Sequence, residues 1–265
     1  MAAPALPELR EAVWRANLAL AAAGLVTLSF GNASGLDAAS GVLLIKPSGV
    51  PYAELRPEHL VAVAVDDGHV VGGGLRPSSD TPTHVALYRR YPEIGGVVHT
   101  HSTAAASWAQ ACRAIPPLGT THADHFRGPV PVTRQLRADE VAGDYELATG
   151  EVIVETLEGL RLSASDMPAA LVASHGPFTW GPDARGAVDN AIALEAVAAM
   201  ASRTFALAPD AVEIAAYLLE RHFQRKHGPA AYYGQAAGNV DTDPGRTAGP
   251  ATGRDPGGDS RGGAA

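Results

Sequence analysis

The sequence predicts an α/β protein with a single domain in three layers, in which a mainly antiparallel central sheet lies between helices. Two valine-rich runs separated by the turn DDGH, beginning at Val61, are typical of a β-hairpin. Helical periodicity is strong near the N-terminus and again over 184–207. Hairpins and helices are mixed along 265 residues with no internal repeat, which is a length that one α/β domain can reach.

The first half of the chain alternates helices and short strands. Apolar residues at helical spacing predict a helix over 7–23, with Gly24 as its C-cap. We expect a strand at 26–30, broken by the turn-rich FGNASG, and a second strand at GVLLIK. The later predicted elements are a helix from Asp80 to about Tyr91, a strand over 95–101 and a short helix over 104–111.

In the second half, a proline-rich PVPV and an acidic segment from Asp139 separate these elements from a strand at AALVASHG. Helices are expected over 184–207 and about 210–227. We therefore expect a domain over 1–235. The remaining 236–265 consist of Gly, Pro, Asp and Arg with almost no apolar residue, which predicts a disordered tail.

Composition excludes several classes of protein. The net charge of −8 leaves no broad basic surface for nucleic acid. A single cysteine excludes an intrachain disulfide and a thiolate-rich zinc site. The N-terminus carries charges before any signal-type apolar run, and no stretch reaches transmembrane length, so we expect a cytoplasmic protein without membrane contact.

Three histidines suggest a metal site. His99 and His101 are two apart on one predicted strand and therefore share a face, and His175 ends another predicted strand. Three neutral imidazoles leave one coordination position open, as in catalytic zinc sites. Asp80 could add a fourth ligand, although its position before Thr81-Pro82 equally suits a helix N-cap.

Three loops have the small, donor-rich character that suits a phosphate group. They contain Gly31 and Asn32, Ser48 and Gly49, and Ser78 and Ser79. Lys46 could add a positive charge, although a lysine at a strand end is usually solvated. Each loop alone would be an ordinary turn.

Proton carriers are harder to select from spacing. Asp124 lies beside two histidines in THADHF, and Tyr232-Tyr233 offers a phenol. A loop aspartate is most often a turn former and a terminal tyrosine most often packs against a neighbour. Spacing alone selects neither residue.

Seven blocks in order resemble the L-ribulose-5-phosphate 4-epimerases, which belong to the class II aldolase superfamily. The blocks, within about residues 8–235, are LVTLSFGNASG, IKPSGVPY, PSSDTPTH, GGVVHTHS, GTTHAD, ASHGPFTWG and RKHGPAAYYGQ. Phe30 departs from the tryptophan that is common in the family, and the Gly/Pro-rich tail is not a family feature. The resemblance implies a class II aldolase-like fold.

The resemblance also implies roles. It implies one Zn²⁺ per subunit bound by His99, His101, His175 and Asp80. It assigns substrate binding, largely around the phosphate, to Gly31, Asn32, Ser48, Gly49, Ser78 and Ser79. It names Asp124 and Tyr233 as proton carriers, with Tyr233 entering the site of a neighbouring subunit in a homotetramer, and His222 and Arg225 bordering that site.

The implied reaction converts L-ribulose 5-phosphate to D-xylulose 5-phosphate in pentose or arabinose catabolism. Cleavage of the C3–C4 bond, rotation of the aldehyde fragment and re-addition would invert C4, because the C4 proton is not adjacent to the C2 carbonyl. One alternative is a fuculose or rhamnulose 1-phosphate aldolase, although such aldolases place glutamate where this chain has Asp80. A second alternative is a non-catalytic adducin-like scaffold, which should lack the three histidines.

Overall fold

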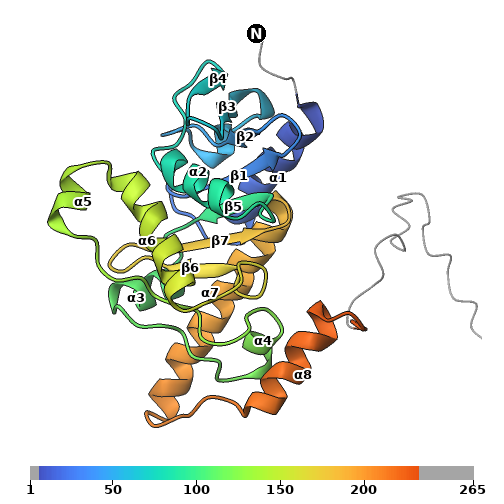
Figure 1. The fold of residues 1–265 in the computed structure, drawn as a ribbon, viewed down its shortest axis with the longest axis vertical. Helices are drawn as coiled ribbons and strands as arrows, with labels where there is room; N and C mark the ends of the chain where they lie inside the picture. Colours follow the sequence, from blue (N-terminus) through green and yellow to red (C-terminus); the bar gives the residue numbers. More distant parts are fainter. Residues whose placement is uncertain (1–5, 233–265) are drawn as a thin grey trace, which may run out of the picture. The chain divides into compact units, whose positions relative to one another are not determined.

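A seven-stranded sheet organises the molecule (Figure 1). The computed structural model describes residues 6–232. The strand order is β4-β3-β2-β1-β5-β7-β6, and each neighbouring pair is antiparallel. The strands are β1 (Asn32–Asp37), β2 (Val42–Ile45), β3 (Val61–Ala64), β4 (Val70–Gly72), β5 (Gly96–His99), β6 (Ala169–Leu171) and β7 (Pro177–Gly181). The predicted α/β class with a mainly antiparallel sheet is confirmed.

Helices flank this sheet. They are α1 (Pro7–Ala22), α2 (Thr81–Arg90), α3 (Thr103–Gln110), α4 (Thr120–Ala123), α5 (Ala138–Ala142), α6 (Tyr145–Gly159), α7 (Ala184–Leu207) and α8 (Ala216–His227). Two short 3₁₀ turns, Tyr52–Glu54 and Pro57–His59, link β2 to β3. None of the helices within residues 6–232 combines the length and hydrophobicity that a membrane span needs.

The strands bury apolar side chains on both faces. In β2, Leu43 belongs to the core cluster that also holds α2 and α6 residues, whereas Leu44 belongs to the cluster that includes α1 and the first half of α7. In β5, Val97 and Val98 divide between the two clusters in the same way. This alternation follows from the two-residue repeat of a strand and produces the predicted three layers.

The predicted strand at 26–30 is wrong, and the segment interpreted as a turn is a central strand. Residues 27–30 form a turn closed by the Phe30 N–H on the Thr27 carbonyl, and β1 begins at Asn32. Its small residues are needed because α1 lies close above the strand: a Cβ on Gly35 would lie 2.7 Å from Val13 Cγ2. Close packing, rather than turn formation, accounts for this composition.

Helix α6 was not predicted, nor was β7. The acidic segment that seemed to separate the two halves contains a helix of 15 residues. Gly150 interrupts its apolar pattern, but Gly150 is where α6 crosses α2: a Cβ there would lie 2.7 Å from Ala86 Cβ and 3.1 Å from Thr83 Cα. The last helix begins at Ala216 instead of about 210. The predicted tail, 236–265, lies outside the described residues.

Candidate metal centre and surrounding pocket

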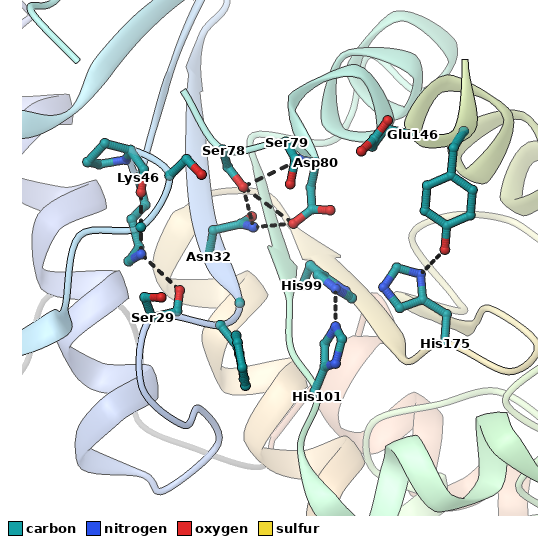
Figure 2. A pocket seen from close by; sticks show the side chains of 16 residues that line it. Ser29, Asn32, Lys46, Ser78, Ser79, Asp80, His99, His101, Glu146 and His175 are labelled. Carbon is teal, nitrogen blue, oxygen red and sulfur yellow. Dashed lines mark hydrogen bonds between the residues drawn. The ribbon is translucent and has the colours of Figure 1, made fainter. Parts of the chain in front are cut away.

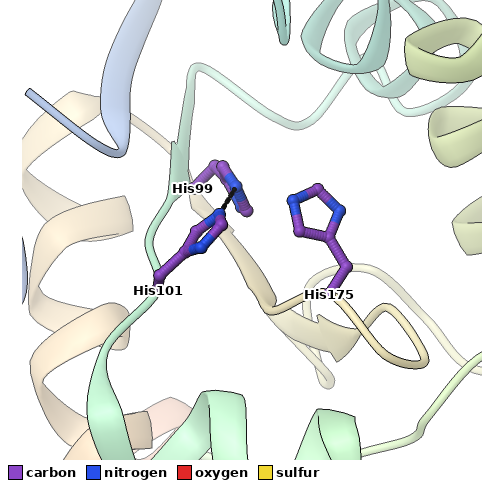
Figure 3. Close-up of side chains that lie close together, drawn as sticks. All are labelled: His99, His101 and His175. Atoms are coloured by element: carbon purple, nitrogen blue, oxygen red, sulfur yellow. Dashed lines mark hydrogen bonds between the residues drawn. The ribbon is translucent and has the colours of Figure 1, made fainter.

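Three imidazoles converge at the end of β5. His99, His101 and His175 each offer a ring nitrogen, and these nitrogens all lie within 4.8 Å of one another. The ring centroids are 4.7–5.1 Å apart, and Figure 3 shows the three rings facing a common space. More than 70 residues separate His101 from His175 along the chain, so the fold brings them together. The sequence alone could not show that the three rings are close enough to share one ion, and in the structure they are.

The protonation of His99 suits a metal ligand. Its Nδ1 lies 3.0 Å from the Pro177 carbonyl oxygen, which can only accept, so the proton is on Nδ1 and Nε2 carries a lone pair. Burial is the main cause that lowers the pKa of His99, to about 3. Phe178 stacks on the ring at a centroid distance of 4.2 Å. A neutral imidazole with one nitrogen held by a carbonyl is the usual state of a metal-bound histidine.

His175 reaches the cluster from a turn, not from a strand end as the sequence predicted. The turn joins β6 to β7 and includes Ser174, with φ 61°, and the His175 N–H donates to the Val172 carbonyl. The next residue must be small, and it is Gly176: a Cβ at this position would lie 2.8 Å from the Thr100 carbonyl oxygen. The close approach that glycine permits is therefore between two main-chain segments, and it brings the turn against the end of β5.

Asp80 faces the same pocket and does not act as a side-chain N-cap. Its carboxylate accepts from Asn32 Nδ2 at 2.6 Å and from Ser78 Oγ at 3.3 Å (Figure 2), and it makes no capping hydrogen bond to α2. Burial alone would raise the pKa of Asp80, but the nearby His99 and His84 rings and the Asn32 amide bring it below its ordinary value. A carboxylate beside three imidazoles is a donor set that suits Zn²⁺.

The predicted phosphate loops lie side by side. The Ser78 N–H donates to the Lys46 carbonyl at 3.1 Å, and the Ser48 N–H donates to the Arg76 carbonyl at 3.0 Å. These two main-chain donors are therefore used within the protein, and the Ser78 hydroxyl is shared between Asn32 and Asp80. Asn32 is paired with His99 across β1 and β5, and its Oδ1 is buried without a hydrogen-bond partner among the described residues.

Lys46 is buried, in contrast to the solvated position expected for a strand-end lysine. Its ammonium donates to the Ser29 carbonyl at 3.2 Å and lies 4.8 Å from the centre of the Tyr52 ring. Burial lowers its pKa to about 8, so the side chain keeps its positive charge at neutral pH. Lys46 is thus a fixed cation in an acidic chain, a role that its sequence position alone did not indicate.

These groups line one cavity of about 390 Å³. Residues of all three loops, Asp80 and the three histidines are among its walls: every predicted metal ligand and substrate-binding residue is present there. The walls also include Tyr145 and Glu146, which begin α6. Sequence reasoning missed both because α6 itself was missed. Tyr145 and Glu146 match no functional motif in the sequence. Their position in the cavity becomes visible only once α6 is known.

The predicted proton carriers are placed differently. Asp124 does not line this cavity; it follows α4 and accepts from Arg225 at 2.7 and 3.0 Å and from His222 at 3.1 Å, both on α8. Burial opposes ionisation of Asp124, but these hydrogen bonds hold its pKa below the ordinary value. Tyr233 lies outside the described residues.

Comparison with known sequences gives consistent matches. The family model described as the Class II Aldolase and Adducin N-terminal domain matches residues 11–202. The L-ribulose-5-phosphate 4-epimerase UlaF of Salmonella paratyphi C is 53% identical over 230 residues, which are 87% of this chain and 100% of the relative. The protein of the same name from Salmonella typhi is 52% identical over the same length.

Solved structures share the fold. An L-fuculose 1-phosphate aldolase matches with a TM-score of 0.65 at 19% identity, covering 84% of this chain and 97% of the other. An aldolase of the same name from Glaciozyma antarctica matches with a TM-score of 0.65 at 20% identity, covering 85% and 86% of the two chains. At this level of identity the likeness is one of architecture.

Proposed function

The chain belongs to the class II aldolase and adducin family, and from this membership we propose that it is a zinc-dependent L-ribulose-5-phosphate 4-epimerase. The observation that carries the proposal is the three-histidine group in a cavity that is also lined by the three serine and glycine loops and by Lys46. Identity of 53% to an epimerase over that relative's full length supports the substrate. The product would be D-xylulose 5-phosphate, in pentose or arabinose catabolism in the cytoplasm.

His99, His101, His175 and Asp80 would hold the Zn²⁺. When bound, the ion acts as a Lewis acid that stabilises the negative charge left on the sugar oxygens when the C3–C4 bond breaks. The four side chains would orient the carbonyl end of the substrate. Asn32 fixes the Asp80 carboxylate through its amide, and the Pro177 carbonyl fixes the His99 ring.

The phosphate end of the substrate would be anchored by the serine and glycine loops that line the same cavity. The hydroxyls of Ser48, Ser78 and Ser79 would supply donors for the phosphate, the Lys46 ammonium would supply one positive charge, and Gly31 and Gly49 would allow close approach of the backbone. Anchoring the phosphate keeps the aldehyde fragment in the site while it rotates. Re-addition to its other face then gives the epimer.

Proton transfer at the C4 oxygen needs a carrier on each side, and we assign these roles to Asp124 and Tyr233. Asp124 is ionised and therefore able to accept a proton. Since it lies outside the cavity of its own chain, it would serve the site of a neighbouring subunit, as would Tyr233. Exposed apolar side chains at Met200, Leu207 and Val212 support self-association, which we propose to be a homotetramer.

A direct assay tests the proposal against its alternatives. Purified protein with Zn²⁺ is incubated with L-ribulose 5-phosphate, and the products are identified. An epimerase equilibrates two pentulose phosphates without accumulating a fragment. Accumulation of dihydroxyacetone phosphate from fuculose or rhamnulose 1-phosphate would support the aldolase alternative, and failure to bind any metal would support the adducin-like scaffold.

A further inference from the structure

The orientation of His175 depends on a contact that the reaction scheme does not use. The phenolic oxygen of Tyr145 lies 3.3 Å from Nδ1 of His175. Figure 2 marks this contact as the dashed line at the His175 ring. The two rings are 6.1 Å apart at an interplanar angle of 34°. In Figure 3 one ring nitrogen of His175 faces His99 and His101 and the other faces away from them.

His175 needs such a contact more than His99 does. His99 ends a strand, is 2% exposed, and has its Nδ1 held by a main-chain carbonyl. His175 is half-buried on a hairpin turn, and the contact of its Nδ1 is with the Tyr145 side chain instead of a main-chain carbonyl. A histidine that binds a metal through one nitrogen needs an acceptor for the proton on the other, or the wrong tautomer competes.

Tyr145 is built into the protein rigidly enough to supply this acceptor. It begins α6, and its own carbonyl accepts from Thr149 Oγ1 at 2.9 Å. Helix α6 packs closely on α2 at Gly150, and Asp80 immediately precedes α2. The same pair of helices therefore carries Asp80 and the tyrosine that contacts His175.

We propose that Tyr145 is a positioning residue whose hydroxyl oxygen accepts the Nδ1–H of His175, which keeps Nε2 of His175 unprotonated and turned toward His99 and His101. The inference rests on the proposed metal site. It assigns Tyr145 no part in the bond-breaking step: the side chain acts on the metal centre through His175.

Tyr145→Phe tests this inference, because it removes the hydroxyl and keeps the ring. Zn²⁺ affinity is measured on purified, metal-stripped protein by competition with a chromogenic chelator. We expect affinity to fall about 10- to 100-fold, the usual effect of removing a group that orients a ligand. Tyr91→Phe is the matched control, since Tyr91 follows the end of α2 opposite Asp80 and does not line the cavity, and its affinity should equal that of the wild type.

A second measurement does not involve a metal. Long-range ¹H–¹⁵N spectra of the metal-free protein report the tautomer of each histidine. In the wild type we expect His175 to carry its proton on Nδ1, and in Tyr145→Phe we expect the Nε2–H form to increase, with the melting temperature of the metal-free protein unchanged.

The outcomes separate this inference from the proposed function. A wild type that binds no Zn²⁺ would overturn the proposed function. A wild type that binds one Zn²⁺ per chain, together with a Tyr145→Phe variant of equal affinity and the same His175 tautomer, would overturn the positioning role alone. A Tyr145→Phe variant that loses affinity only in proportion to a lower melting temperature would also overturn it, because the hydroxyl would then serve the fold.

Discussion

Nε2 of His99 and Nε2 of His101 lie 3.0 Å apart. Because the proton of His99 is committed to the Pro177 carbonyl, His101 must donate its own Nε2–H across this gap. Two nitrogens so close share one proton in the metal-free protein. A cation between them requires His101 to move its proton to Nδ1, after which both lone pairs face the ion. The two rings are therefore close enough for one metal ion to be bound by both.

The first prediction concerns His99→Asn. Asparagine cannot place a nitrogen lone pair at the position of Nε2, so Zn²⁺ binding should weaken by at least about tenfold and epimerase turnover should fall with it. Zn²⁺ at 100 times its dissociation constant should stabilise the wild type by about 2.7 kcal/mol, and at the same Zn²⁺ concentration a variant that binds ten times more weakly should gain only about 1.4 kcal/mol. Metal content and thermal melting with and without Zn²⁺ measure both effects.

His69→Asn is the control for this variant because His69 is exposed and near Asp67, away from the pocket. It should bind Zn²⁺ as the wild type does. Unchanged zinc content and unchanged turnover in His99→Asn would contradict the assignment of His99 as a ligand.

Acid should destabilise the protein through His122. Burial lowers the pKa of His122 to about 4, its Nε2–H donates to the Gly128 carbonyl at 2.7 Å, and its Nδ1 is buried without a partner among the described residues. The unfolded chain binds a proton at about pH 6.5, which is above the folded pKa. Stability is therefore fully present above pH 6.5 and is lost as pH falls toward 4, by up to about 1.4 kcal/mol per pH unit.

His122→Gln isolates this contribution, because glutamine can still donate to the Gly128 carbonyl but does not titrate. Urea unfolding of metal-free protein between pH 7.5 and 4.5 gives the free energy of unfolding of both proteins. The wild type should lose more stability than the variant over this range. Parallel pH dependences would show that His122 is not protonated on unfolding.

Gly150→Ala should destabilise the protein although alanine favours a helix by about 1 kcal/mol over glycine. The new Cβ would lie 2.7 Å from Ala86 Cβ and 3.2 Å from the Thr83 carbonyl oxygen, so α2 and α6 must separate. We expect a net loss of about 1–3 kcal/mol, measured by urea unfolding. Gly159→Ala, in the same helix with nothing within 4 Å of the new Cβ, should be neutral or stabilising. Equal stability of the two variants would contradict the packing argument.

Gly150 and Gly35 also show where sequence reasoning failed. Periodicity predicted α1 and α7 well, because both present apolar residues at helical spacing, and the helix-start signal at Asp80-Thr81-Pro82 located α2. It failed where backbones approach so closely that glycine replaces an apolar residue, as in β1 and α6. In the sequence, a glycine at such a position looks like a turn residue. Its role in close packing is visible only when the neighbouring helix or strand is known.

The candidate site was predictable for a different reason. The motif blocks include His99, Asp80 and the serine loops. The resemblance therefore assigned these residues to one site without any knowledge of the fold, and they do line one cavity. Tyr145 belongs to no such block, and the burial of Lys46 depends on Tyr52 and Ser29, which approach only after folding. The position of Asp124 outside the cavity of its own chain could also not be read from spacing.

Shared sites between subunits give the last prediction. If the metal ligands and the proton carriers of one site come from different chains, two inactive variants should restore activity when their subunits mix. His99→Asn and Tyr233→Phe, co-expressed with different affinity tags and purified through both, should recover about a quarter of wild-type turnover, because one interface in four then combines two intact partners.

The mixture of His99→Asn with Asp124→Asn should recover activity in the same way, since Asp124 lies outside the cavity of its own chain. The double variant His99→Asn/Tyr233→Phe, mixed with His99→Asn, provides no intact site and should stay inactive. Activity of the first two mixtures no greater than that of their parents would place both proton carriers in the same chain as the histidines they serve.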